Sequence, residues 1–135
     1  MKNFILFSVL YFTTVLFTSC NKEIPQRDIK IKKGSCNLVA DKRNIAICFD
    51  SLINESRCPV NIDIYCIWGG YASAAFRLNT GGVSTTFKLS TLNVGNLHTD
   101  TVINNIKITL KDILPYPGAD NTPEAKETVA ILEVQ

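Results

Sequence analysis

The side chains that could carry out catalysis are few in this chain. The 135-residue sequence contains a single histidine, His98, which lies in the polar stretch 95–100. A hydrolase triad would need this histidine as a base beside a nucleophile and an orienting acid. No G-x-S-x-G motif is present, and Ser84, Ser90 and Asp100 stand in no recognisable catalytic context. We therefore interpret His98 as an exposed loop residue and predict that the protein is not an enzyme.

Motifs that hold phosphates or metal ions are also missing from the sequence. Neither Gly69-Gly70 nor Gly81-Gly82 is followed by the Lys and Ser or Thr of a phosphate-binding loop. Asp112, Asp120 and Asn121 do not have the regular spacing of a calcium loop. We expect no catalytic residue, no cofactor and no metal site.

Trp68, the only tryptophan, allows two interpretations. It could be an exposed aromatic platform on which a sugar ring stacks, or a core residue beside a disulfide, with Gly69 and Gly70 allowing a bulge or bend. Because Trp68 shares period-two parity with the three preceding alternate residues, we expect it on the buried face of a strand. Those residues are Ile62, Ile64 and Cys66. The better candidates for surface binding are Tyr65, Tyr71 and Tyr116, since a tyrosine keeps a polar tip at a wet site.

The elements that must position these side chains read as short strands. Apolar residues alternate at period two, and the runs are separated by turn sequences at 41–44, 79–82 and 115–118. The expected strands lie at 38–40, 45–49, 62–68, 74–78, around 87–89, 101–110 and 128–134, with room for a first one at 29–31. This pattern predicts an all-β fold, either an antiparallel β-sandwich (Ig-like or related) or a small barrel.

The N-terminal residues resemble a bacterial lipoprotein signal. Lys2 gives a positive start, residues 4–17 are almost entirely apolar, and Thr18-Ser19 precede Cys20. The apolar run is shorter than the roughly 20 residues that cross a bilayer as a helix, so it reads as a signal peptide. The resemblance implies cleavage before Cys20 and lipid, such as palmitate, on its thiol and new amino group. By the same resemblance, Asn21 after the cysteine implies sorting to the outer membrane; plain secretion with Cys20 as a spare thiol is the alternative.

The other four cysteines form an even set in an exported chain, which predicts disulfides. Four cysteines allow three connectivities, and the sequence does not choose among them. A tight reversal near Lys42 would place Cys36 and Cys48 opposite each other, while Cys58 and Cys66 would close a short loop. These are the pairings we favour. No C-x-x-C pair is present to support a zinc site.

We expect one domain behind a cleaved leader. The predicted parts are a signal peptide at 1–19, a lipidated Cys20 with a polar tether over 20–34, and a single β domain over 35–135. Cleavage would remove Lys2 and no acidic residue, leaving a net charge near +1, which does not suit a nucleic-acid partner. The basic bias of the tether fits a solvated linker or contact with anionic lipid.

Three short patterns concern glycosylation. Asn54-Glu55-Ser56 matches the N-glycosylation acceptor, which a bacterial lipoprotein rarely uses. Ser51 and Thr101 each follow an aspartate and precede an apolar residue, so they resemble the O-glycosylation sites of Bacteroidota. We keep Ser51 and Thr101 as candidate sites.

Three segments together resemble a group of small lipoproteins of Bacteroidota and neighbouring bacteria. They are Ser56-Arg57-Cys58-Pro59, Cys66-Ile67-Trp68-Gly69-Gly70-Tyr71-Ala72 and Leu114-Pro115-Tyr116-Pro117. The resemblance covers roughly residues 36–135, does not include Cys36 or Cys48 as part of its pattern, and implies no activity. The loop between Cys58 and Cys66 is a couple of residues longer than is usual in the group.

Two functions are therefore open. The first is a lipid-anchored, non-catalytic domain of the cell envelope that binds a protein or glycan partner. The second is a surface protease inhibitor, with the loop 59–65 as its inhibitory segment, or a small hydrolase-like enzyme.

Overall fold

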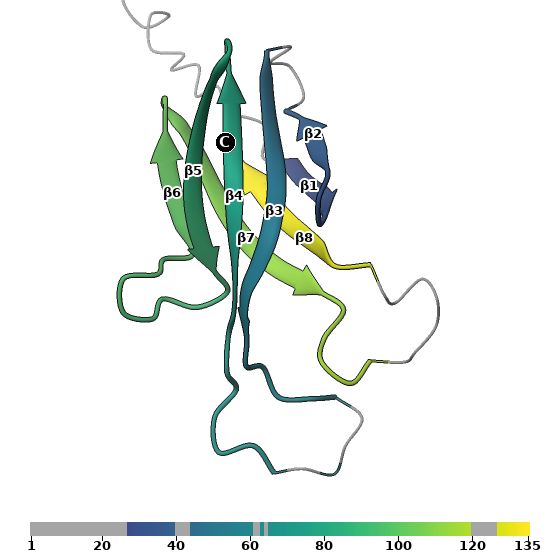
Figure 1. Ribbon diagram of the computed structural model, residues 1–135. Coiled ribbons are helices and arrows are strands. Elements are labelled where there is room, and N and C mark those ends of the chain that lie inside the picture. The colour runs from purple at the N-terminus through teal and green to yellow at the C-terminus, as the bar shows by residue number, and fades with distance from the viewer. Residues whose placement is uncertain (1–26, 40–43, 61–62, 64, 120–126) are drawn as a thin grey trace, which may run out of the picture.

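Eight strands form two antiparallel sheets packed face to face in the computed structural model (Figure 1), which describes residues 27–39, 44–60, 63, 65–119 and 127–135. The strands are β1 (Arg27–Lys32), β2 (Cys36–Leu38), β3 (Ile45–Glu55), β4 (Ala72–Thr80), β5 (Val83–Ser90), β6 (Asp100–Ile103), β7 (Ile106–Leu114) and β8 (Val129–Val134). One sheet has the order β1-β8-β7-β6 and the other β2-β3-β4-β5. The all-β prediction is confirmed. Because no ladder joins the two sheets in the described residues, the arrangement is the sandwich and not the barrel.

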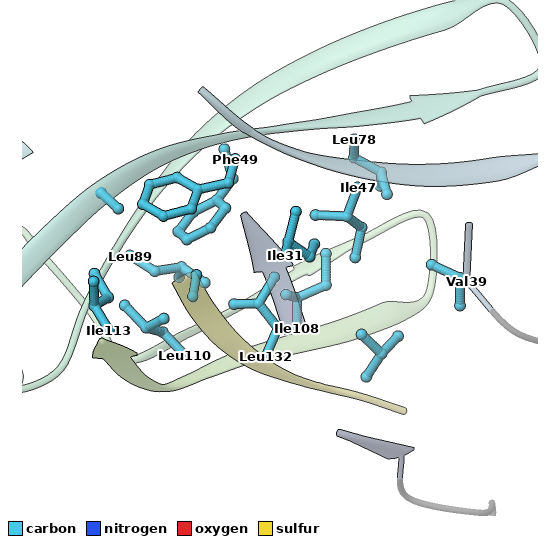
Figure 2. Packing of buried hydrophobic residues seen from close by; sticks show 14 of the residues in the cluster. Ile31, Val39, Ile47, Phe49, Leu78, Leu89, Ile108, Leu110, Ile113 and Leu132 are labelled. Carbon is cyan, nitrogen blue, oxygen red and sulfur yellow. The ribbon is translucent and has the colours of Figure 1, made fainter. Parts of the chain in front are cut away.

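Apolar side chains from both sheets fill the space between the layers (Figure 2). The predicted alternation at 45–49, 74–78 and 106–110 is confirmed, since the inward residues are almost fully buried apart from Ile45, which is partly buried. The rings of Phe49 and Phe76 pack with their centroids 5.2 Å apart. Burying a side chain of this size contributes about 1.5–3 kcal/mol, so this alternation supplies the main driving force for the fold.

Two short hairpins rest on residues with positive φ. Gly81 and Gly82 (φ 54° and 86°) link β4 to β5, as the turn sequence predicted. Asn104 and Asn105 (φ 52° and 61°) split the expected strand 101–110 into β6 and β7. A two-residue hairpin turn with both φ values positive favours Gly and Asn. The single strand expected over 101–110 was therefore wrong, because its many Val, Ile and Thr residues outweighed the Asn pair.

The first strand begins inside the range expected for the tether. Residues 27–32 pair with β8 along its whole length, and Ile31 is fully buried. The alternation of Ile29 and Ile31 is the sequence feature behind this pairing. The sandwich thus includes residues 27–34, which the expected tether of 20–34 had left out.

Both favoured disulfide pairings are confirmed. Cys36 and Cys48 lie directly opposite each other in the β2–β3 ladder and are bonded. Cys58 and Cys66 are bonded within the connection between β3 and β4. Each bridge therefore closes a local segment of the chain.

The strand expected over 62–68 is not formed by the part of it that the structure describes. Residues 65–71 are irregular, whereas positions 61, 62 and 64 lie outside the described residues. Trp68 is 61% exposed, so the prediction that it is buried beside the disulfide was wrong. Period-two parity fixes a side chain's face only in an uninterrupted strand, and the Cys58–Cys66 bridge turns this segment into a closed loop.

The two ends of the sandwich differ. At one, called here the entry end, the β4–β5 and β6–β7 turns meet, and the Asn104 side-chain amide donates to the Thr80 hydroxyl at 3.2 Å. β1 starts at this end, because Arg27 pairs with Val134 near the C-terminus. The opposite end, called the loop end, carries the described parts of the connections that follow β3, β5 and β7 (Figure 1).

Candidate functional site

The three segments that carry the sequence resemblance meet at the loop end. The amide of Ser56 donates to the Tyr71 carbonyl at 3.0 Å, which joins the first segment to the second. A guanidinium nitrogen of Arg57 lies 3.4 Å from the Pro115 carbonyl, which joins the first segment to the third. Segments far apart in the chain thus build one cluster.

Arg57 is the centre of this cluster, and only 7% of it is exposed. Its guanidinium makes two bonds to the Glu55 carboxylate, at 2.8 and 2.5 Å. A further bond of 2.9 Å reaches the Asp112 carboxylate on β7. Because Glu55 ends β3 and Asp112 belongs to the other sheet, Arg57 ties the two layers together.

The environment keeps Arg57 charged and oriented. Burial by itself would lower its pKa, but the hydrogen bonds and charge of Glu55, helped by the charge of Asp112, outweigh that effect and raise the pKa. One face of the Tyr116 ring lies 4.1 Å from the guanidinium carbon, a cation–π contact. Tyr116 is 38% exposed and so presents another part of its ring to solvent.

Gly70 explains how the second segment packs so closely on the first. A Cβ atom at this position would lie 1.8 Å from the Ser56 carbonyl oxygen, and φ is +65°. Only glycine fits both the space and the backbone conformation. Gly69 beside it has open space around its own Cβ direction.

Aromatic and apolar side chains project from this end into solvent. Tyr65 is 93% exposed, Ile67 is 94% exposed, and both flank Cys66 of the disulfide. The Trp68 indole meets the Tyr71 ring edge to face, with centroids 6.3 Å apart. Of the sequence-based candidates for surface binding, Tyr65 is confirmed as fully solvent-facing, and Trp68 joins it.

A cavity of about 340 Å³, lined about equally by polar and apolar atoms, opens beside the Arg57 cluster. Its lining residues include Val60, Gly69, Gly70, Thr91, Leu92, Lys111, Asp112 and Tyr116. The ionisable side chains on its wall are already paired: Arg57 and Asp112 with each other, and Lys111 with Glu133 at 2.5 Å. The hydrogen bond to Glu133 is the main reason that the pKa of Lys111 is raised. The cavity therefore offers hydrogen-bonding groups without a free charge.

A second, more apolar cavity of about 570 Å³ lies near Tyr116, which lines both. Leu114, Pro115 and Val129 supply much of its wall. Val60 and Tyr116 thus line both cavities at the loop end.

The structure does not assemble a triad around His98. This residue is exposed in the connection 91–99, and its backbone carbonyl accepts a hydrogen bond from the Ser90 amide at 2.9 Å. Within the described residues, no hydrogen bond joins the His98 imidazole to a serine or an acid. Asp100 instead pairs with Lys107 at 3.4 Å.

The remaining sequence-based candidates are spread over the molecule. Ser51 is exposed on β3, and Thr101 is half-buried on β6. The Asn54 side-chain amide donates to the Ser56 hydroxyl and the Tyr71 carbonyl, at 3.2 and 3.3 Å, so it supports the cluster. Cys20 lies outside the described residues. In the part of the chain that the structure covers, no group of three His, Cys, Asp or Glu side chains could hold a metal ion.

The central role of Arg57 was missed by the sequence analysis. Its only signal was its position before Cys58 in the first segment of the resemblance. The chain matches no protein-family model, no curated protein and no solved structure. Across the described ranges, no helix is long and apolar enough to cross a membrane.

Proposed function

We propose that this chain is a lipid-anchored, non-catalytic protein of the cell envelope, at the outer membrane, whose loop end binds a glycan. The anchor is the lipidated Cys20 implied by the resemblance to lipoprotein signals. The observation that carries the ligand class is the exposed indole of Trp68, which directly precedes Gly69 and Gly70 in the wall of a cavity whose charged side chains are paired.

The position of β1 supports this display. The tether after Cys20 leads to Arg27, which lies at the entry end of the sandwich. The connection between β3 and β4, whose described part contains Trp68, lies at the opposite end (Figure 1). An anchored molecule would therefore hold its loop end away from the membrane, where a glycan chain can reach it.

The chemistry of the loop end favours a neutral sugar over an ion. An ionic ligand would have to compete with the existing pairs of Arg57 and Lys111, whose partners are already within hydrogen-bond distance. A sugar ring instead presents C–H groups that pack on an indole face and hydroxyls that can bond to the cavity wall. The Thr91 hydroxyl accepts a bond from the Ala72 amide at 3.0 Å and still has its own hydrogen to donate.

Trp68 also provides the test, because it is the sole tryptophan and its emission reports on this site alone. We expect a neutral tetrasaccharide from a panel of maltotetraose, cellotetraose and chitotetraose to shift or quench that emission. Calorimetric titration should show at least a tenfold loss of affinity in Trp68→Ala. Tetragalacturonate, a charged tetrasaccharide, should bind no better than the neutral probes.

Ile67→Ala is the matched control, since Ile67 is adjacent and even more exposed but has no ring. It should retain binding, and both variants should melt within about 2 °C of the parent, as surface substitutions usually do. Failure of every neutral sugar to bind, or an equal loss of affinity in Trp68→Ala and Ile67→Ala, would contradict the glycan site. Hydrolysis of a probe that disappears in His98→Ala would contradict the non-catalytic assignment.

A further inference from the structure

The four edge strands of the sandwich are protected to different degrees. Exposed strand edges invite pairing with other chains, and proteins usually shield them with charge, short length or covering elements. β1 carries four charged residues in six, β6 has only four residues, and β2 has three and is tied by Cys36–Cys48. β5 is protected least, with one charged residue in eight.

β5 is a regular edge of eight residues (Figure 1). It pairs with β4 from Val83 to Ser90 without a register shift, and it contains no proline. Lys88 is its only charged residue. The neighbouring strand β6 belongs to the other layer, so it does not pair with this edge.

The hairpin turn decides which backbone groups of β5 are free. In a two-residue hairpin the residues that flank the turn, here Thr80 and Val83, exchange both hydrogen bonds, and pairs then alternate along the ladder. The amides and carbonyls of Ser84, Thr86 and Lys88 therefore face away from β4. The Ser90 amide has the same parity, and it indeed donates outward, to the His98 carbonyl.

We propose that the β5 edge receives an extended strand from a partner protein, which adds a fifth strand to the sheet β2-β3-β4-β5. The partner strand would bond to the outward backbone groups of Ser84, Thr86 and Lys88. It would carry alternate apolar residues, because Phe87 packs only partly against the core at this edge, and an acidic residue opposite Lys88. Backbone pairing of this kind gives affinity, and the side-chain alternation gives specificity.

A second copy of the chain fits this edge less well than a separate partner. Two copies of β5 related by a two-fold axis would pair antiparallel, so their entry ends would point in opposite directions. Residues 20–26 can span at most about 25 Å, less than the length of β5 itself at about 27 Å. Two such molecules could not both be anchored in one membrane with their strands along the membrane normal, which is the orientation that displays the loop end. This step, and only this one, rests on the proposed lipid anchor.

The test places a photo-crosslinking amino acid, p-benzoylphenylalanine, at Ser84 or at Lys88 in the full-length protein in its own cells. Both positions face the same side, four residues apart on one strand. An added strand must therefore give crosslinked positions four residues apart in the partner's sequence, which peptide mass spectrometry can read. Crosslinks without that spacing, crosslinks to a second copy, or no crosslinks would each overturn the proposal.

Thr86→Pro provides the functional arm, because it removes an outward N–H without removing a bond to β4. We expect at least a tenfold loss of crosslinking at both positions with unchanged secondary structure. Thr86→Val, which keeps the N–H, should crosslink like the parent. If Thr86→Pro fails to fold, Lys88→Glu replaces it, with the crosslinker at Ser84. The new carboxylate should repel the acidic residue of the partner strand and so lower the yield of crosslinked product. Undiminished crosslinking in the folded variant would overturn the proposal. Sugar binding at Trp68 is a separate measurement, and it tests only the proposed function of the loop end.

Discussion

At the scale of the residue, Arg57 is the side chain whose removal we expect to lower the free energy of unfolding most, judged from the described contacts. Removing one partner from a buried ion-pair network typically costs 3–5 kcal/mol. The Glu55 and Asp112 side chains left behind are 24% and 28% exposed, so water can compensate in part. We expect Arg57→Ala to lower the free energy of unfolding by about 3 kcal/mol, measured by urea denaturation. Arg57→Lys keeps the positive charge but lacks the planar guanidinium, so its free energy of unfolding should lie between those of the parent and Arg57→Ala.

Arg77 is the matched control for this measurement. It pairs with Asp50 at 2.9 Å, but the two side chains are 43% and 36% exposed. Exposed pairs contribute about 0–1 kcal/mol, so Arg77→Ala should change the free energy of unfolding little. Equal urea midpoints for the two alanine variants would show that Arg57 does not tie the sheets together.

The neighbouring glycines give a second comparison at the same scale. Gly70→Ala places a methyl group 1.8 Å from the Ser56 carbonyl oxygen at a φ of +65°, so backbone must move. We expect the free energy of unfolding to fall by at least about 2 kcal/mol, because the left-handed conformation and the clash both disfavour alanine. Gly69→Ala meets open space and should melt close to the parent. Thermal unfolding by circular dichroism distinguishes the two variants.

At the scale of the element, the two disulfides have separate roles. Each closes a short loop, since its cysteines are 12 or 8 positions apart. By the chain-entropy argument, each bridge should raise the free energy of unfolding by roughly 2–3 kcal/mol. The double variant Cys36→Ser/Cys48→Ser should lose stability of this order and keep sugar binding, because its bridge lies in the β2–β3 ladder. The double variant Cys58→Ser/Cys66→Ser should also weaken sugar binding, since it frees the loop that holds Trp68. Denaturation and calorimetry on both variants test this division.

The strands were largely predictable because period-two alternation reflects burial on one face, as in β3, β4 and β7. The favoured cysteine pairings followed from the same pattern, since Cys36 and Cys48 flank a reversal. Trp68 was not predictable from parity. The Cys58–Cys66 closure and the fit of Gly70 on Ser56 remove this segment from the sheet, and those are tertiary constraints. The Arg57 network was equally hidden, because its partner Asp112 is far away in sequence.

At the scale of the whole molecule, the two ends of the sandwich have different chemistry. The entry end has tight turns and receives the chain at Arg27, whereas the loop end gathers Arg57, the aromatic side chains and both cavities. Antiparallel sandwiches place their connections at two ends, so one end can hold the anchor while the other varies. The edge of β5 lies between these ends and presents a third surface of backbone groups.

The last prediction concerns the anchor that would orient this molecule. Intact-mass analysis of the protein from its own cells should show loss of residues 1–19 and the added mass of acyl chains. Cys20→Ala should not be lipidated and should leave the membrane fraction, since a near-neutral domain has little other affinity for lipid. Asn21→Asp keeps the acyl chains, and by the resemblance to lipoprotein signals it should shift the protein from the outer to the inner membrane. If Cys20→Ala still sediments with membranes after a high-salt wash, the lipid does not hold the protein there. Something other than a lipid on Cys20 would then have to hold the loop end away from the membrane.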